Sequence, residues 1–317
     1  MSDHTSTAPS VTLPGSELEV FPLCLGGNVF GWTADQPTSF AVLDAYLAAG
    51  GDFIDTADTY SAWLPGNSGG ESESIIGEWA GRRGVRDRVV IATKVAKWSA
   101  RPGLSPANIA AAIDDSLARL QTDYVDLYYA HAEDPDTPLE YSLAAFDELV
   151  KVGKVRAVGL SNFSIEAITA ALEICERDGL TRPVAVQPEY SLVAREQADV
   201  LALSEREGLA CMPYYALASG FLTGKYRPGR SVQSQRSGRA SAYLEDPRAE
   251  RLLAALDEIA SAHQTGVAAV AIAWLREQPS VAAPIASART TEQLAEILPG
   301  ARLELTDSEL ERLSDAW

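Results

Sequence analysis

The chain has 317 residues, of which 46% are hydrophobic, so it can enclose a large core, and α/β barrels of this length fold as one unit. Its formal net charge of −18 argues against nucleic acids and anionic membrane surfaces as partners, because both are negatively charged. No apolar run is long enough to span a membrane, and the polar start contains no signal-peptide core, so we expect a soluble, cytoplasmic protein. The cysteines lie far apart in apolar stretches, which predicts buried thiols and neither a disulfide framework nor a metal site.

Short apolar runs that end at polar positions alternate with segments of helical periodicity. The runs cover residues 21–27, 52–57, 88–95, 124–131, 155–162, 183–190, 209–216 and 281–287. Amphipathic segments between them include residues 106–120, 139–151, 164–176 and 195–207. This alternation predicts a parallel sheet, and its repetition predicts a closed (β/α)8 TIM barrel with outer helices. We therefore predict a flexible tail over residues 1–15 and a single barrel domain over residues 16–317.

Two stretches interrupt this alternation. Residues 61–72, after the second run, are rich in Gly, Pro and Ser, and residues 218–246, after the seventh run, are mostly polar. Long loops of this kind in a compact domain are usually functional or disordered. The final stretch, residues 305–317, has the pattern of a capped C-terminal helix.

Polar side chains stand where the apolar runs end, which in a barrel is the end that carries the active site. Asp55 and Tyr60 follow the second run, Lys94 lies in the third and His131 ends the fourth. The later runs end at Ser161, Asn162, Gln187 and Tyr214. Barrel closure would bring these distant positions to one mouth.

Lys94 is unusual because it lies inside an apolar run, where an unpaired charge is costly. Its side chain could extend to the rim of the barrel, or its ammonium could pair with Asp55 on the neighbouring strand. A paired Lys94 would lower the pKa of a nearby phenol, and a neutral His131 could orient a hydrogen bond. Together with Tyr60 these groups predict a proton-transfer site, which would need a cofactor to supply a hydride.

Seven motifs carry a resemblance to a known family. In order along the chain they are "FIDTADTY", "IATKV", "LYYAH", "GLSNFS", "VQPEYSL", "PYYALASGFLTGKY" and "IASARTTEQLAEI". Over nearly its whole length the sequence resembles the aldo-keto reductases. The resemblance implies a (β/α)8 barrel that binds NADPH in an extended form across its mouth, without a Rossmann domain.

The resemblance also implies a catalytic tetrad. Asp55, Tyr60, Lys94 and His131 match its four positions. Tyr60 would be the acid in carbonyl reduction and the base in alcohol oxidation. Lys94, held by Asp55, would lower the pKa of Tyr60, and His131 would orient the carbonyl group.

Three groups of cofactor contacts follow from the same resemblance. The nicotinamide end would be bound by Ser161, Asn162 and Gln187, with Tyr214 stacked on the ring. The pyrophosphate would run along residues 217–225, with contacts from Leu217, Ser219, Gly220 and Lys225. The adenosine end would meet Ser287, Arg289, Gln293 and Glu296, and Arg289 would bind the 2′-phosphate, so NADPH is expected rather than NADH.

The chain departs from the family pattern in the loop that would follow the pyrophosphate. Many relatives have "PYSPLA" where this chain has "PYYALA" at residues 213–218. Tyr215 and Ala216 thus replace a small polar residue and a proline.

The expected partner is a small-molecule carbonyl compound or alcohol. Trp32, Trp63 and Trp98 fall in loops after the first three runs, where each could pack at the rim or line a substrate pocket. If all three face inward, sugars and aromatic carbonyl compounds become plausible substrates.

Two other functions remain open from the sequence. The potassium-channel β subunits resemble the same family and use bound cofactor chiefly for sensing, so a regulatory protein is one alternative. A barrel hydrolase with paired carboxylates, drawn from Asp55, Asp58 and Glu133, is the other. A hydrolase has no use for the cofactor-like motifs and would bind no nicotinamide cofactor.

Overall fold

The structure is a computed structural model that describes residues 10–227, 229 and 237–317. Eight parallel strands form its central sheet, in the spatial order β10-β3-β4-β5-β6-β7-β8-β9. The strands are β3 (Cys24–Gly26), β4 (Phe53–Asp55), β5 (Val90–Val95), β6 (Val125–Ala130), β7 (Val155–Ser161), β8 (Ala185–Gln187), β9 (Ala210–Cys211) and β10 (Ile285–Ala286). Each of the eight predicted apolar runs contains one of these strands.

The sheet closes on itself between β9 and the segment that leads into β10. Cys211 pairs in parallel with Val281, and the Ala282 amide donates to the Cys211 carbonyl at 2.9 Å. A further bond joins the Ile285 amide to the Pro213 carbonyl at 2.8 Å. The predicted (β/α)8 barrel is therefore confirmed.

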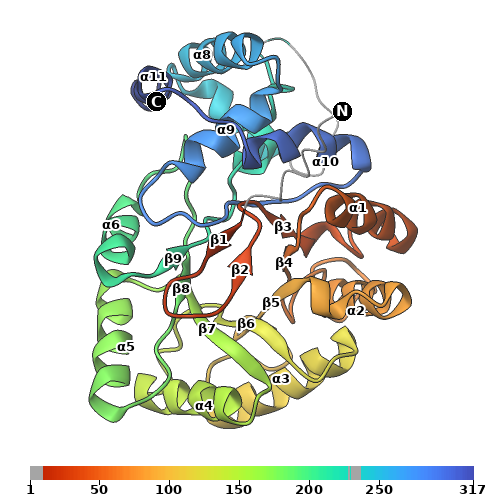
Figure 1. The fold of residues 1–317 in the computed structure, drawn as a ribbon, viewed down its shortest axis with the longest axis vertical. Helices are drawn as coiled ribbons and strands as arrows, with labels where there is room; N and C mark the ends of the chain where they lie inside the picture. Colours follow the sequence, from red (N-terminus) through yellow and green to blue (C-terminus); the bar gives the residue numbers. More distant parts are fainter. Residues whose placement is uncertain (1–9, 228, 230–236) are drawn as a thin grey trace, which may run out of the picture.

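Helices surround the strands on the outside (Figure 1). The first six follow strands β3 to β8 in turn: α1 (Gln36–Ala48), α2 (Glu71–Arg83), α3 (Pro106–Leu120), α4 (Leu139–Lys151), α5 (Ile165–Asp178) and α6 (Ala198–Glu207). The later helices are α8 (Ala249–Ala262), α9 (Val267–Arg276), α10 (Thr291–Ile297) and α11 (Asp307–Asp315), and short 3-10 turns are η1 (Gly27–Val29), η2 (Arg86–Arg88) and η5 (Leu298–Ala301).

Local sequence explains where these helices begin and end. At the start of α3 the Ser105 hydroxyl accepts a hydrogen bond from the Asn108 amide, and Pro106 occupies the first turn, where a missing N–H costs nothing. At the start of α11, Thr306 and Glu309 form a reciprocal capping box. The C-terminal helix predicted within residues 305–317 is this α11.

The N-terminal end of the barrel is covered by a hairpin of β1 (Val11–Thr12) and β2 (Glu19–Val20). Leu13, Leu18 and Val20 are buried in one cluster with residues from the starts of the barrel strands, such as Phe53. Figure 1 shows the hairpin lying across the barrel. The sequence pattern predicts a tail over residues 1–15 and contains no signal for this hairpin, whose first strand lies within that range. Residues 1–9 lie outside the described residues.

Both predicted long loops lie at the opposite, C-terminal end of the strands. The first joins β4 to α2 through residues 56–70. The second follows β9 and contains η3 (Ala218–Thr223), α7 (Ser237–Ala242) and η4 (Tyr243–Glu245), whereas residues 228 and 230–236 of the predicted loop lie outside the described residues. No helix in the described part of the chain combines the length and the apolar character needed to cross a bilayer.

Candidate active site

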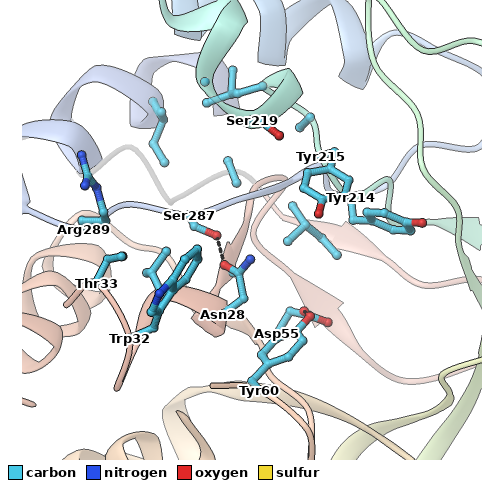
Figure 2. A pocket seen from close by; sticks show the side chains of 18 of the residues that line it. Asn28, Trp32, Thr33, Asp55, Tyr60, Tyr214, Tyr215, Ser219, Ser287 and Arg289 are labelled. Atoms are coloured by element: carbon cyan, nitrogen blue, oxygen red, sulfur yellow. Dashed lines mark hydrogen bonds between the residues drawn. The ribbon is translucent and has the colours of Figure 1, made fainter. Parts of the chain in front are cut away.

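A cavity of about 680 Å³ opens at the C-terminal ends of the strands (Figure 2). Of the predicted tetrad, Asp55, Tyr60 and His131 line it, whereas Lys94 lies beneath its surface. Each predicted cofactor-binding residue also lines this cavity: Ser161, Asn162, Gln187, Tyr214, Leu217, Ser219, Gly220, Lys225, Ser287, Arg289, Gln293 and Glu296. The fold therefore brings to one place residues that are up to 241 positions apart, from Asp55 to Glu296.

Lys94 joins two of the tetrad side chains at the floor of the cavity. Its Nζ lies 2.6 Å from Asp55 Oδ2 and 2.9 Å from Tyr60 Oη. The same ammonium donates to the Thr56 carbonyl at 2.7 Å, and the Tyr60 hydroxyl donates to Asp55 Oδ2 at 3.1 Å. Three oxygen atoms thus surround one ammonium group, and the phenol touches both members of the ion pair.

The burial of this ion pair settles how Lys94 is accommodated. The Lys94 side chain is fully buried and that of Asp55 is 2% exposed. A charge in such a place is tolerated only when a partner and further hydrogen bonds satisfy it. Of the two interpretations offered by the sequence, the structure confirms pairing with Asp55 and excludes extension to the rim.

The pKa of Tyr60 is raised well above 10, and not lowered as the sequence analysis expected. Burial of the phenol is the largest cause, followed by the negative charge of Asp55 and the hydrogen bond to its carboxylate. The expectation rested on the ammonium of Lys94 held by Asp55, and it left out the burial of the phenol and the negative charge of Asp55, which raise the pKa of Tyr60. Tyr60 is therefore a protonated phenol at neutral pH.

His131 presents a neutral imidazole to the same cavity. Burial lowers its pKa well below 6.5, and the positive charges of Lys94 and Lys97 lower it further. Its Nδ1 is buried without a hydrogen-bond partner among the described groups. The rings of His131 and Tyr60 lie 6.3 Å apart in an edge-to-face arrangement, so both face the same part of the cavity.

A hydrogen-bond network links the predicted nicotinamide contacts to the ion pair. Gln187 Nε2 donates to Asp55 Oδ1 at 3.0 Å, and the Ser161 hydroxyl donates to the Gln187 carbonyl at 2.9 Å. Asn162 Nδ2 donates to Ser161 Oγ at 3.0 Å, while its Oδ1 accepts from the Tyr214 hydroxyl at 2.7 Å. These side chains are therefore fixed relative to Asp55 by direct contacts.

The turn after β9 has an unusual backbone where it lines the cavity. Tyr215, Ala218 and Ser219 adopt positive φ angles of 56°, 46° and 58°, which residues with a Cβ rarely take. Gly220 and Gly224 are also left-handed, at 100° and 76°. Backbone strain of this kind persists where the surroundings enforce it, and it clusters at ligand sites.

The far end of the cavity, away from Tyr60, carries a guanidinium group. The Arg289 side chain has no hydrogen bond or ion pair among the described residues, while its backbone amide donates to Gln293 Oε1 at 3.0 Å. Nearby, the Ser287 hydroxyl donates to Asn28 Oδ1 at 2.6 Å (Figure 2). Gly26 is required beside them, because a Cβ there would lie 2.6 Å from Ser287 Oγ.

Two of the three predicted tryptophans line the cavity. Trp32 and Trp63 meet edge to face with ring centroids 5.5 Å apart, and Trp63 lies 6.2 Å from the Tyr60 ring. Trp63 is 48% exposed, which is unusual for so large an apolar side chain. Trp98 is not among the lining residues, and its indole N–H donates instead to the Ser68 carbonyl at 2.7 Å. That hydrogen bond turns Trp98 toward the β4–α2 loop.

Further residues that line the cavity were not predicted from the sequence, among them Asn28, Lys97 and Tyr215. Asn28 and Lys97 each lie shortly after the end of a barrel strand, and Tyr215 directly follows Tyr214. The rule that located the other residues, a polar side chain just after a strand end, could have found the first two.

The carboxylates proposed for a hydrolase are not arranged for that chemistry. Asp55 is engaged by Lys94, Asp58 is buried outside the cavity lining, and Glu133 Oε1 accepts from the Ser164 amide at 2.5 Å. Within the described residues, no group of His, Cys, Asp and Glu side chains is placed to hold a metal ion.

Comparison with known proteins shows the family of the chain. The model of the aldo/keto reductase family matches residues 22–317. The chain belongs to the aldo/keto reductase family. Its relatives include the uncharacterized oxidoreductase YrpG of Bacillus subtilis, with 34% identity over 95% of this chain and 93% of the relative. Norsolorinic acid reductase stcV of Emericella nidulans is 31% identical, and an aryl-alcohol dehydrogenase of Pestalotiopsis microspora is 29% identical, each over 96% of this chain and 80% of the relative. Family and relatives place this aldo/keto reductase among the oxidoreductases.

Proposed function

We propose that this protein reduces an aldehyde or ketone to an alcohol with NADPH, and that Tyr60 donates the proton. The observation that carries the proposal is the contact of Lys94 Nζ with both Tyr60 Oη and Asp55 Oδ2 at the floor of the cavity. A protonated phenol held against a buried ammonium can release its proton to a developing alkoxide, because the ammonium stabilises the phenolate that remains.

The residues along the cavity fit a nicotinamide dinucleotide phosphate. The cavity continues from Tyr60 past the strained turn at residues 215–219 to the unpaired guanidinium of Arg289. A guanidinium without a partner among the described residues suits a phosphate group, which it can bind through two parallel hydrogen bonds. Ser161, Asn162 and Gln187 would hold the nicotinamide end, and Arg289 would hold the 2′-phosphate. When bound, NADPH supplies the hydride.

The tetrad side chains have separate tasks in this proposal. The carbonyl oxygen of the substrate lies between the Tyr60 hydroxyl and the neutral imidazole of His131, which both donate hydrogen bonds to it. As negative charge grows on that oxygen, the proton of Tyr60 moves to it, and the phenol is later reprotonated from solvent. Lys94 stabilises the phenolate, and the ion pair with Asp55 holds the Lys94 ammonium in place.

The raised pKa of Tyr60 keeps its hydroxyl in the protonated form that carbonyl reduction requires at neutral pH. Reduction needs the protonated phenol, and a pKa above 10 keeps it protonated. Oxidation of an alcohol needs the phenolate as a base, whose fraction at neutral pH is small.

The wall beside Tyr60 supports an aromatic or similarly flat apolar substrate. Trp32 and Trp63 form this wall, and the exposed face of Trp63 is available to a ligand. Aromatic surfaces bind other aromatic rings through stacked or edge contacts. Two relatives bear the names norsolorinic acid reductase and aryl-alcohol dehydrogenase, which agree with such a substrate.

The direct test is a fluorescence titration of the purified protein with NADPH and, separately, with NADH, followed by assays of benzaldehyde reduction. We expect saturable binding that is at least about tenfold tighter for NADPH, because Arg289 adds a charge-assisted contact. Arg289→Ala should weaken NADPH binding by about tenfold and change NADH binding little. The matched control is Arg88→Ala, which removes an exposed arginine outside the cavity.

Failure to bind either nucleotide would contradict the proposed function. Equal losses for NADPH and NADH in Arg289→Ala would keep the reductase but assign the 2′-phosphate to another residue.

A further inference from the structure

Lys97 lies at the cavity on the side away from the residues assigned to the phosphates. It follows strand β5 by two residues and lines the cavity that contains Tyr60 and His131. In the closed sheet β5 is separated from β10 by β3 and β4, and from β9 by β6, β7 and β8. Lys97 is therefore nearly opposite the wall formed by the turn after β9 and by Arg289, and it belongs to the part of the cavity left for substrate.

The ammonium of Lys97 has no protein partner among the described residues. Three other lysines form ion pairs in the described part of the chain: Lys94 with Asp55, Lys151 with Asp147 and Lys154 with Asp114. Lys97 has neither an ion pair nor a hydrogen bond in the described part of the chain. The internal stretch 228–236, most of which lies outside the described residues, contains no Asp or Glu.

The surroundings of Lys97 disfavour the charged form of its ammonium group. Partial desolvation and the positive charge of Lys94 lower the pKa of Lys97, and no carboxylate counteracts them. Its other ionisable neighbour is His131, whose imidazole Lys97 helps to keep neutral. The Lys97 side chain is exposed to solvent, so its cation is accessible to a ligand, and it has no carboxylate partner among the described residues of a chain whose formal net charge is −18.

We propose that Lys97 is a specificity residue that binds a carboxylate on the substrate, so that this protein prefers carbonyl compounds carrying a carboxylate over uncharged ones. The proposal rests on the proposed function and names its substrate class more closely. A substrate carboxylate beside Lys97 would pair with a cation that has no partner among the described residues. Its carbonyl group would lie at Tyr60 and His131, and its apolar body would lie along Trp32 and Trp63.

A carboxylate fits this place better than a phosphate. One ammonium balances one negative charge, and a phosphate monoester carries nearly two at neutral pH. Among the residues that the structure describes, no arginine lines the cavity on this side to offer the paired donors that favour phosphate, since Arg289 lies on the opposite wall.

The test compares substrates that differ mainly in charge. Reduction of 3- and 4-carboxybenzaldehyde is measured beside reduction of their methyl esters, with saturating NADPH, for the wild type and Lys97→Met. The quantity compared is the ratio of kcat/KM for the acid to kcat/KM for its ester, which cancels general losses of activity. We expect this ratio to fall by about tenfold in Lys97→Met for at least one isomer, and mainly through KM. Lys97→Arg should restore most of the ratio.

Two further measurements separate specificity from stability. Benzoate, which cannot be reduced, should inhibit the wild type competitively and should inhibit Lys97→Met about tenfold more weakly. Lys151→Met, which removes a lysine from α4 outside the cavity, should leave the ratio unchanged.

The outcomes distinguish this inference from the proposed function. If the esters are reduced and the acid-to-ester ratio is unchanged in Lys97→Met for both isomers, the carboxylate site is wrong and the reductase stands. If the wild type reduces no acid and no ester with NADPH, the proposed function fails, and this inference fails with it.

Discussion

The two ends of the barrel are built from the same eight strands, yet their interiors are opposite in character. At the N-terminal end the hairpin side chains Leu13, Leu18 and Val20 fill the opening with buried apolar groups. At the C-terminal end the interior holds the buried Asp55–Lys94 ion pair beneath an open cavity. The N-terminal end therefore stabilises the fold through packing. The C-terminal end instead holds charged groups beside the cavity in which substrate and cofactor would bind.

The difference shows how one barrel can be stable although its active site contains a buried ion pair whose desolvation opposes folding. A buried ion pair adds little net stability, because desolvation of the two charges offsets their attraction. Apolar side chains packed at the other end contribute to stability without any such cost. Substitutions at the two ends should thus affect stability and activity in different proportions.

The largest effect is expected from Lys94→Met, which leaves the Asp55 carboxylate buried and unpaired. Unfolding free energy should fall by about 3–5 kcal/mol, and turnover should fall by about 10³-fold because the phenolate of Tyr60 loses its cation. Chemical denaturation and steady-state assays would measure the two effects.

The double variant Lys94→Met/Asp55→Leu sharpens this prediction. It should regain most of the lost stability while remaining inactive, because it removes both charges from the interior. A single Lys94→Met variant as stable as the wild type would show that the buried pair does not have the cost assigned to it.

At the N-terminal end, Leu13→Ala should reduce the stability of the fold and leave ligand binding at the active site unchanged. Leu13 is fully buried in the hairpin, so its truncation should cost about 2–5 kcal/mol through lost burial and a new cavity. The affinity for NADPH and KM for the carbonyl substrate should stay within about twofold. The exposed Val152→Ala is the matched control and should change stability by less than about 0.5 kcal/mol. A large change in NADPH affinity in Leu13→Ala would mean that the two ends are coupled.

A smaller effect is expected from Asp58, a buried carboxyl in the loop after β4. Both of its oxygens lack a hydrogen-bond partner among the described groups, and burial together with the charge of Glu73 raises its pKa to about 7. The folded protein therefore holds a proton on Asp58 that the unfolded chain releases near pH 4. This contribution to stability is present at low pH and is lost as pH rises from 4 through 7.

Thermal or denaturant unfolding at pH 5 and pH 8 would test that linkage. Between these values the wild type should lose roughly 2–3 kcal/mol more stability than Asp58→Asn, which cannot titrate. The exposed Asp123→Asn should show the same pH dependence as the wild type. An identical pH dependence of stability in Asp58→Asn and the wild type would contradict the claim that Asp58 holds a proton in the folded protein.

Much of the fold and of the site was predictable because it depends on local pattern and on parallel-strand geometry. Apolar runs and helical periodicity identify the strands and helices of a barrel, and parallel strands must end at one face. This geometry predicts that Asp55 and Lys94 lie at one mouth, with their pairing as one of two alternatives, and the family resemblance adds most of the polar residues that line the rest of the cavity.

The remaining features depend on contacts that the sequence pattern does not contain. The hairpin was missed because its two-residue strands are too short for a periodic signal and its burial comes from distant barrel residues. The direction of the Tyr60 pKa shift was wrong because burial and Asp55 outweigh Lys94 only in the assembled site. The sequence likewise does not show that Lys97 lacks a partner among the described residues, because that depends on which side chains the fold places beside it.

The most direct test of the central claim is Tyr60→Phe, assayed for reduction of methyl 4-formylbenzoate and for NADPH binding. The account predicts that kcat falls by about 10²–10⁴-fold, because the proton donor is gone, while the dissociation constant of NADPH changes by less than about twofold. Turnover close to that of the wild type would contradict the account, because the proton would then come from a group other than Tyr60.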